Sequence, residues 1–454
     1  MKNYSPWLYQ LDQARSSHKL ERVIAPHAAI VGAGIAGIAT AFFALKYTDQ
    51  TVVVLERHKL AHGATGHNAG QVVSYFERGF ASLVEEFGLD MAAQGQQAVE
   101  DAWSLLDEMY TDAGLDIPFA RFVGHTGLSS FSQVLVNLEN NRARREAGLR
   151  LEDIIISRDA LFLRELPLKY AGLYRLSAPQ EILERLESIN PDYIACVSYQ
   201  KGCVNSALFC QEVARYLLGA YPGRFALYEH TAVHKIILHE SVAVLDLGEH
   251  AIKARRVVLC TNGFEDFSII NENGLGVDGR FHASLQGRVA YMSGYLEVLN
   301  KPPMAVSYFP EPGASKDENY FYLTRRPYEY EHRPGHNLVL LGGPDELLPE
   351  QARYSHDREF PERHVAVFDA FLRRTYELDP NKKIEYLFTW HGLMGYTKNG
   401  VRMVGPEPQN PILLYNLGCN GVGILPSVMG GRVVARHIAD EQVAKSIFDV
   451  PTAR

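Results

Sequence analysis

The chain has 454 residues and a formal net charge of −8, with 46% hydrophobic and 22% charged residues, proportions that are ordinary for a soluble globular protein. This length predicts more than one domain. No block of like positive charge occurs along the chain, so nucleic acid is not an expected partner.

The first 27 residues are polar and mixed in charge, without the basic-then-apolar order of a secretory signal. They form an N-terminal extension, residues 1–27, to which the sequence assigns no role. The five cysteines are an odd number and include no C-x-x-C pair, which argues against a disulfide framework and against a cysteine-rich zinc site. We therefore expect a cytoplasmic protein that holds no metal.

An uncharged run of 18 residues follows, Ala28 to Leu45, about the length at which a membrane span begins. Its glycines favour another interpretation, because Gly32, Gly34 and Gly37 form a G-x-G-x-x-G pattern between a buried strand, "AAIVG", and a helical pattern. A second buried strand, "TVVVLE", then ends at Glu56. A glycine-rich packing or membrane segment would leave Glu56 unexplained, so we expect no transmembrane segment.

This order of strand, glycine turn, helix, strand and acid predicts a dinucleotide-binding site. Gly32 permits the tight turn, Gly34 lets a pyrophosphate approach the backbone, and Gly37 lets helix and strand pack closely. The first residues of the helix, Ile35 and Ala36, present free N–H groups and a partial positive charge to the phosphates. Glu56, followed by Arg57, is placed to accept hydrogen bonds from ribose hydroxyls, and its charge disfavours the 2′-phosphate of NADP.

A second glycine-rich stretch, "HGATGHNAGQ" at residues 62–71, lies just after this acid. Its small residues and backbone donors allow close approach to a large, flat, anionic cofactor. The alternative is a helix-capping loop that touches no ligand. We expect cofactor contacts from most of the stretch: Gly63, Ala64, Thr65, His67, Asn68, Ala69, Gly70 and Gln71.

The stretch "ERHKLAHGATGHNAGQ" closely resembles a signature of the D-amino-acid-oxidase-like family of FAD-dependent amine and amino-acid oxidoreductases, which includes glycine/sarcosine oxidases and gamma-glutamylputrescine oxidases. The resemblance implies FAD as the cofactor and a helix that begins between Thr65 and Gln71. It continues in "FALYEHTAVHKI", "AIKARRVVLCTNGF" and "LLYNLGCNGVGILPSVMGGRVVARHIA". There it implies further cofactor contacts at Val233, Thr261, Asn262, Gly263, Gly421, Val422, Gly423 and Ile424.

The same resemblance implies an α/β fold, with a Rossmann-like FAD domain of the glutathione-reductase type and a second α+β substrate domain on a mixed or antiparallel sheet. We expect the FAD domain to be discontinuous, at 28–80, 201–266 and 389–454, and the substrate domain to occupy 81–200 and 267–388. Helical periodicity predicts a helix in "MAAQGQQAVEDAWSLLDEMY" and a charged helix over 138–151. The runs "GRVAYMSGYLEV", "NYFYLTRR" and "NLVLLGG" are typical of antiparallel strands.

Histidine chemistry near the cofactor has two interpretations. His58, His62 and His67 would have to converge to bind a metal, and the glycines between them give no rigid scaffold. Some members of the family link FAD covalently through a histidine in a G-x-T-x-H-x-A-G run, and His67 stands in that register. Gly66, however, replaces the bulky aromatic residue of those members, so the linkage stays open.

Substrate recognition is expected from "NYFYLTRRPYEYE", in which Tyr320, Phe321 and Tyr322 supply aromatic walls and Arg325 supplies a guanidinium for a carboxylate. The alternative for Arg325 is an arginine at a strand end with no ligand. His391 would orient the substrate or tune the flavin, or would be a hydrogen-bonded core histidine. We name Arg325, His391 and Tyr322 as the candidate catalytic residues.

These features predict an FAD-dependent oxidoreductase that acts on the C–N bond of a small amine or amino acid. The sequence leaves open whether the enzyme is an oxidase or a dehydrogenase. Two alternatives remain: an FAD-dependent enzyme acting on a hydroxy acid or other C–O substrate, and a flavin-bound partner protein without turnover. The oligomeric state is not predicted.

Overall fold

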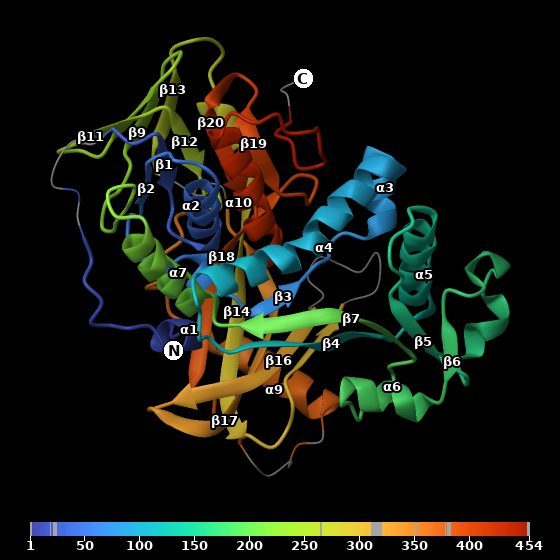
Figure 1. The fold of residues 1–454 in the computed structure, drawn as a ribbon. Helices are drawn as coiled ribbons and strands as arrows, with labels where there is room; N and C mark the ends of the chain where they lie inside the picture. Colours follow the sequence, from blue (N-terminus) through green and yellow to red (C-terminus); the bar gives the residue numbers. More distant parts are fainter. Residues whose placement is uncertain are drawn as a thin grey trace.

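The computed structural model describes residues 2–18, 20, 25–263, 266–309, 320–349, 352–376, 378 and 383–451 (Figure 1). One sheet has six strands in the order β19 (Met403–Glu407), β20 (Asn410–Leu417), β12 (Arg256–Leu259), β1 (Ala28–Val31), β2 (Val52–Leu55) and β8 (Phe225–Tyr228). All neighbours are parallel except β19 and β20. The strands β1 and β2 are buried at every position, which is typical of a parallel sheet covered on both faces.

The two faces of this sheet have different covers. Ile30 and Val54 belong to the core that contains α2 (Ile35–Tyr47), α7 (Ser206–Ala220) and α10 (Ile424–Ile438). Ala29 and Val53 pack instead into a core with a four-stranded sheet, ordered β11 (Ala251–Ala254), β10 (Ala243–Asp246), β9 (Lys235–Leu238) and β13 (Ser268–Asn271). Alternate residues of one strand therefore bury themselves in two cores, as the two-residue period of a strand requires.

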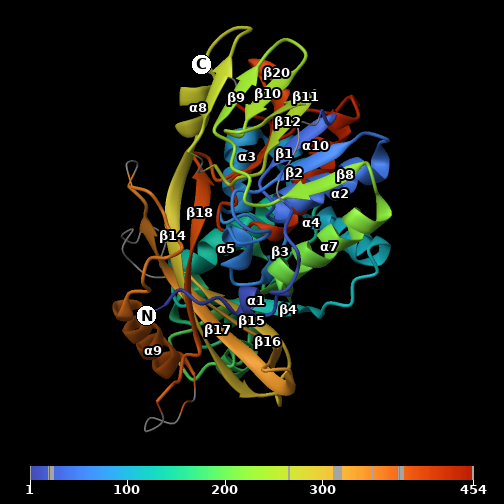
Figure 2. The same cartoon turned by 90° about the vertical axis from the view of Figure 1, so that its left-hand side faces the viewer.

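The second layer is a ten-stranded mixed sheet (Figure 2). Its strands run in the order β18 (Phe388–Thr397), β14 (Leu285–Val298), β17 (Arg333–Leu347), β16 (Phe321–Tyr330), β15 (Met304–Tyr308), β4 (Phe119–Leu128), β7 (Ala195–Val204), β5 (Asp153–Ser157) and β6 (Arg175–Ser177), with β3 (Gln71–Val73) beside β7. The predicted antiparallel strands are confirmed as β14, β16 and β17. The α/β class and the second domain on a mixed sheet are confirmed.

The remaining helices surround these sheets. They are α3 (Phe80–Phe87), α4 (Leu89–Asp112), α5 (Phe131–Glu146), α6 (Pro179–Leu186), α8 (Asp278–His282) and α9 (Glu362–Thr375), and α9 covers the outer face of the ten-stranded sheet (Figure 2). The helix predicted from "MAAQGQQAVEDAWSLLDEMY" is α4. The charged helix expected over 138–151 is α5, which starts earlier because Ser130 and Gln133 form a capping box and which ends at Glu146.

The sheets divide the chain differently from the expected segments at three strands. The strand β13, expected in the substrate segment 267–388, pairs with β9 in the four-stranded sheet. The strand β18, expected in the FAD segment 389–454, pairs with β14 in the ten-stranded sheet. The six-stranded sheet resumes only at Met403. The strand β3, expected in the FAD segment 28–80, also belongs to the ten-stranded sheet. The strands β18 and β3 both contribute residues to the lining of the cavity described below.

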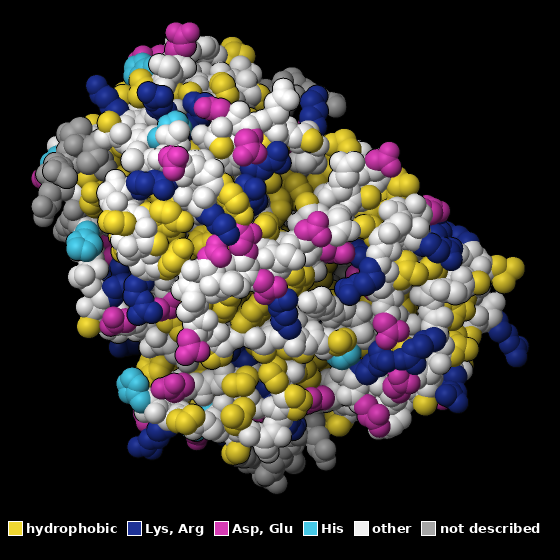
Figure 3. Space-filling model, viewed as in Figure 1, with side chains coloured by type: hydrophobic (Ala, Val, Ile, Leu, Met, Phe, Trp, Pro, Cys, Tyr) yellow, Lys and Arg dark blue, Asp and Glu magenta, His cyan; other side chains and the backbone are white. Residues whose placement is uncertain are grey.

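The run from Ala28 to Leu45 folds as the strand β1, a turn and most of α2, as the glycine pattern predicts. Among the described residues, no helix combines the length and apolar character that crossing a bilayer requires. On the face seen in Figure 3, lysine and arginine side chains alternate with aspartate and glutamate.

Candidate FAD and substrate site

A cavity of about 490 Å³ lies between the carboxyl ends of β1 and β2 and the inner face of the ten-stranded sheet. Ligands of open α/β sheets bind at the carboxyl ends of the strands. Twenty-one of the predicted cofactor residues line this cavity: Gly32, Gly34, Ile35, Ala36, Glu56, Arg57, Gly63, Ala64, Thr65, His67, Asn68, Ala69, Gly70, Gln71, Val233, Thr261, Asn262, Gly421, Val422, Gly423 and Ile424. The other two predicted cofactor residues, Gly37 and Gly263, do not line the cavity.

The turn between β1 and α2 has the geometry that the glycine pattern predicts. Gly32 has φ +105°, and a Cβ there would lie 2.7 Å from the Cys260 carbonyl oxygen. A Cβ on Gly37 would lie 1.9 Å from the Gly32 oxygen, so Gly37 serves packing rather than ligand contact. Gly34 is the N-cap residue of α2 and, being a glycine, has no side chain that could accept a hydrogen bond from the first N–H groups of the helix. The Ile35 N–H, predicted to be free, donates to the Thr65 hydroxyl at 3.0 Å, so the N–H groups that follow it in the first turn of α2 are those available to an anion.

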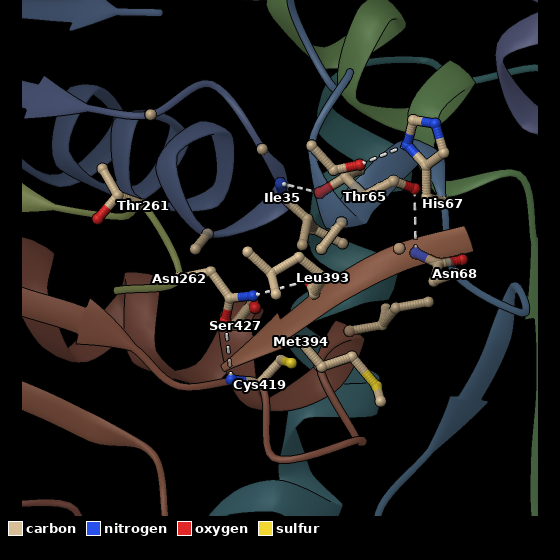
Figure 4. Close-up of a pocket in the computed structure, with 18 of the residues that line it drawn as sticks. Ile35, Thr65, His67, Asn68, Thr261, Asn262, Leu393, Met394, Cys419 and Ser427 are labelled. Atoms are coloured by element: carbon tan, nitrogen blue, oxygen red, sulfur yellow. Dashed lines mark hydrogen bonds between the residues drawn. The ribbon is translucent and has the colours of Figure 1, made fainter. Parts of the chain in front are cut away.

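Two polar side chains after β12 have different roles. The Thr261 Oγ1 atom is buried and has no hydrogen-bond partner among the described residues. Because it lines the cavity, it fits a polar atom of a bound cofactor. Asn262 instead joins two protein segments, since its amide donates to the Leu393 oxygen at 3.3 Å and its Oδ1 accepts from the Cys419 N–H at 3.2 Å (Figure 4).

Glu56 is held rigidly at the end of β2. Its Oε2 accepts a hydrogen bond from the Ala33 N–H at 3.0 Å, and its Oε1 accepts one from the His58 N–H at 2.8 Å. Val233 and Arg57 line the cavity at the same end. A fixed carboxylate beside the phosphate turn fits the ribose of a dinucleotide.

The stretch 62–71 contacts the cavity, but the helix expected to begin between Thr65 and Gln71 is wrong. A single 3-10 turn covers Ala64–Gly66, and β3 starts at Gln71. Gly70 has φ +67°, which no right-handed helix contains. The Asn68 side chain accepts from the Gly70 N–H at 2.7 Å, a local turn that competes with a helix. At the phosphate end, the Thr65 hydroxyl accepts from the Ile35 N–H at 3.0 Å (Figure 4).

The N-terminal extension, to which the sequence assigned no role, packs against residues 62–71 and donates hydrogen bonds to their backbone. It contains the short helix α1 (Pro6–Tyr9). Ser5 Oγ donates to the Gly66 oxygen, and the indole N–H of Trp7 donates to the Asn68 oxygen, both at 2.5 Å. Trp7 is 0% exposed, and a Cβ added to Gly70 would lie 2.8 Å from its ring. Trp7 therefore fixes the backbone that borders the cavity.

His67 is a buried, neutral ring on the cavity wall. Its Nδ1 donates to the Gly63 oxygen at 2.9 Å, so its Nε2 carries the free lone pair (Figure 4). Its ring stacks on His356, with centroids 4.3 Å apart. Burial, with His356 as a second cause, lowers the pKa of His67 to about 3.

Tyr322 lines the far end of the cavity with Tyr320 and Phe321, but Arg325 does not. The Arg325 guanidinium donates to both carboxylate oxygens of Glu187, at 2.8 and 2.6 Å. The reason is the strand period: on β16, Tyr322 faces the cavity, and a residue three positions later faces the opposite side. Arg325 thus has its carboxylate partner within the protein, which corrects its expected role as the substrate clamp.

His391 also lies away from the cavity, which corrects its expected place beside the substrate. It is 1% exposed, and both ring nitrogens have partners. Nδ1 pairs with the Tyr354 hydroxyl and Nε2 donates to the Arg358 oxygen, each at 2.9 Å. His391 thereby anchors the segment that carries His356, which agrees with the core-histidine interpretation.

Several cavity residues were missed because nothing local marks them. Glu77 is the most notable, since its carboxylate faces the cavity and accepts from the Tyr396 hydroxyl at 2.9 Å. Glu77 is exposed to the open cavity, yet the surrounding protein raises the pKa of its carboxyl to about 7, and Asp345 adds to the effect. Tyr75 and Ser307 line the same end. Glu77 and Tyr75 lie in "SYFERG", two residues after the predicted cofactor stretch, but that run carries no recognised motif.

A phosphate-binding turn, a fixed acid and an elongated cavity under a second sheet define a dinucleotide-binding enzyme of the two-domain flavoprotein class. The chain belongs to the FAD-dependent oxidoreductases, because the family model described as "FAD dependent oxidoreductase" (DAO) matches residues 27–437. FAD is its cofactor, and the residues of the phosphate turn together with Thr261 and Glu56 fit it.

Individual relatives are distant. "Putative Rieske 2Fe-2S iron-sulfur protein YhfW" of Bacillus subtilis is 22% identical over 62% of this chain, and the chain spans only 48% of that relative. "Probable oxidoreductase OrdL" of Haemophilus influenzae is 19% identical over 92% of this chain and 84% of its own length. The solved glycine oxidase of Geobacillus kaustophilus has the same fold, with a TM-score of 0.66 and 18% identity over 95% of this chain and 99% of its own.

Proposed function

We propose that the protein oxidises the C–N bond of a small amine or amino acid. Bound FAD supplies the hydride acceptor, and water then hydrolyses the resulting imine to a carbonyl compound and an amine or ammonia. The observation that carries the proposal is the end of the cavity beyond residues 67–71, where aromatic side chains and one carboxylate, Glu77, surround a space next to the loop that precedes α10. The likeness to a glycine oxidase agrees with this class of substrate.

The protein's part in this reaction is placement and proton handling. An amine must lose its ammonium proton before its C–H can be oxidised, and a carboxylate with a pKa of about 7 is able to hold that proton near neutral pH. The walls formed by Tyr320 and Tyr322 exclude water from the substrate. The N-terminus of α10, whose N-cap Gly423 lines the cavity, favours negative charge on the bound cofactor.

A phosphorylated C–O substrate is less well supported. The described lining residues include two guanidinium groups, those of Arg57 and Arg402, and no lysine. Arg57 lies next to Glu56 at the ribose end, and Arg402 donates to the Asn416 side chain at 2.6 Å and to the Asn416 oxygen at 2.9 Å. We also propose a cytoplasmic location, with which the five free cysteines agree.

The test is an anaerobic screen of the yellow holoenzyme against amines, amino acids and hydroxy acids, with the visible absorbance of the flavin as the readout. We expect amines or amino acids to bleach the flavin. Bleaching by hydroxy acids alone would overturn the proposal in favour of a C–O substrate. No bleaching by any compound, with FAD still bound, would favour the flavin-bound partner protein.

His67 allows a separate test of how FAD is held. Because its Nε2 lone pair is free and its ring lies on the cavity wall, it is the candidate for a covalent bond to the flavin. Acid precipitation separates the two possibilities. Flavin that stays with the pellet in wild type but not in His67→Ala indicates the bond, and flavin released by wild type rejects it while leaving the non-covalent contact intact.

A further inference from the structure

We propose that the substrate is a cationic amine with no carboxylate beside its nitrogen, and that Glu77 holds it against a wall of tyrosine rings. This inference rests on the proposed function, because it specifies which of the amines and amino acids the cavity accepts. It follows from three features of the far end of the cavity: the position of Glu77, the rings around it, and the partners of the nearby cations.

Glu77 faces the cavity as a carboxylate without an ion pair among the described residues. Its one hydrogen bond there comes from the Tyr396 hydroxyl. Its Oε1 lies against the loop before α10, so that a Cβ added to Gly421 would be 1.6 Å away. The nearest cation, Arg288, already donates through Nε to Asp345 Oδ1 at 2.7 Å. Glu77 is exposed in the open cavity, so a ligand that covers it would have to carry the opposite charge to compensate the carboxylate.

Aromatic rings surround this carboxylate. Tyr320 and Tyr322 have ring centroids 6.0 Å apart, and Tyr75 lines the same end of the cavity. Tyr322 has room for its ring because the residue opposite it on β17 is Gly342, where a Cβ would lie 2.3 Å from the Tyr322 hydroxyl. The faces of tyrosine rings attract ammonium groups, and a desolvated ammonium gains most from them. Rings and carboxylate therefore favour the same kind of ligand.

A substrate carboxylate, by contrast, finds no unpaired cation at the far end of the described lining, because the guanidinium of Arg57 lies next to Glu56 at the ribose end. Arg325 is paired with Glu187, and Arg402 is bonded to the protein backbone and to Asn416. The remaining alternative is Lys201, which is 0% exposed and does not line the cavity. Its ammonium donates to the Ser307 hydroxyl at 2.9 Å, so Ser307 stands between it and a ligand.

The charge on Glu77 makes the proposal testable by pH. Enclosure and Asp345 raise its pKa to about 7, whereas Tyr396 and Arg288 lower it. A bound cation would lower it further, so binding at pH 7 should release about half a proton, and affinity should rise as the pH increases through 7. The other titratable or charged groups that interact with Glu77 are Tyr75, Tyr320, Tyr322 and Cys419.

The experiment is calorimetric titration of the holoenzyme with tetramethylammonium, which has no nitrogen lone pair and so is not oxidised, and in parallel with acetate. Titrations in buffers of different ionisation enthalpy count the released protons. We expect tetramethylammonium to bind, Glu77→Gln to weaken it at least tenfold and abolish proton release, and acetate not to bind. Glu85→Gln is the matched control, because Glu85 lies exposed on α3 away from the cavity.

The outcomes separate this inference from the proposed function. Binding of acetate but not tetramethylammonium, lost in Lys201→Met, would overturn the inference and assign carboxylate recognition to Lys201. Equal binding of tetramethylammonium by wild type and Glu77→Gln would also overturn it. If tetramethylammonium binds through Glu77 and yet no amine bleaches the flavin, cation recognition is supported and the proposed oxidation fails.

Discussion

Replacing Trp7 by alanine should weaken FAD binding although Trp7 is not among the cavity-lining residues. Trp7 is 0% exposed, and truncating such a side chain costs about 3–5 kcal/mol. Loss of its hydrogen bond to the Asn68 oxygen removes about 1 kcal/mol more. If about 2 kcal/mol of this total stabilises the backbone of residues 66–70 in its binding conformation, the FAD dissociation constant rises by roughly 10- to 100-fold.

The assay is titration of the apoprotein with FAD, followed by quenching of flavin fluorescence, with urea unfolding of the same variants. Trp7→Phe keeps most of the ring and should lie between wild type and Trp7→Ala. Phe368→Ala is the control, because Phe368 is 0% exposed and packs under α9 on the other side of the ten-stranded sheet. The reasoning is refuted if Trp7→Ala and Phe368→Ala lose similar stability and both bind FAD like wild type.

Three further predictions concern charged side chains. Glu56→Arg should weaken FAD binding at least tenfold in the same titration, because the ribose loses its acceptor. Arg325→Gln should lower the urea unfolding free energy by roughly 2–3 kcal/mol, while the substrate KM stays unchanged. Burial lowers the pKa of Lys201 from 10.5 to about 7, so the unfolded chain binds more protons between these values and stability rises with pH there. Lys201→Met should therefore stabilise the fold more at about pH 6 than at about pH 9, and equal gains at both would contradict this.

The cofactor half of the site could be predicted because its signals are contiguous. Gly32, Gly34, Gly37 and Glu56 belong to one strand–turn–helix–strand unit, in which each residue's role follows from its neighbours in the chain. The stretch 62–71 was located correctly for the same reason, but its conformation was not. Its turn depends on Gly70 at positive φ and on contacts with Trp7, more than 50 residues away, which no local pattern reveals.

The substrate half could not be predicted in the same way. Tyr322 and Arg325 were both expected at the substrate, although their odd spacing on one strand places them on opposite faces. The true partner of Arg325, Glu187, comes from another part of the chain. Glu77 gains its role only because β18 and the loop before α10 fold against it, which brings residues 77, 396 and 421 together. Long-range pairing of this kind carries no signal in one sequence.

The attachment of residues 2–7 has a consequence for how the protein is made. Besides the contacts with Gly66 and Asn68, the Thr389 hydroxyl donates to the Lys2 oxygen, 387 residues away, and the Tyr328 hydroxyl donates to the Pro6 oxygen. At about 5–20 residues per second, the ribosome needs roughly 20–80 s to reach Thr389 after releasing Lys2. Throughout that interval the N-terminal segment lacks its bond from Thr389, and so the nascent chain can complete the support of its cofactor pocket only near the end of translation.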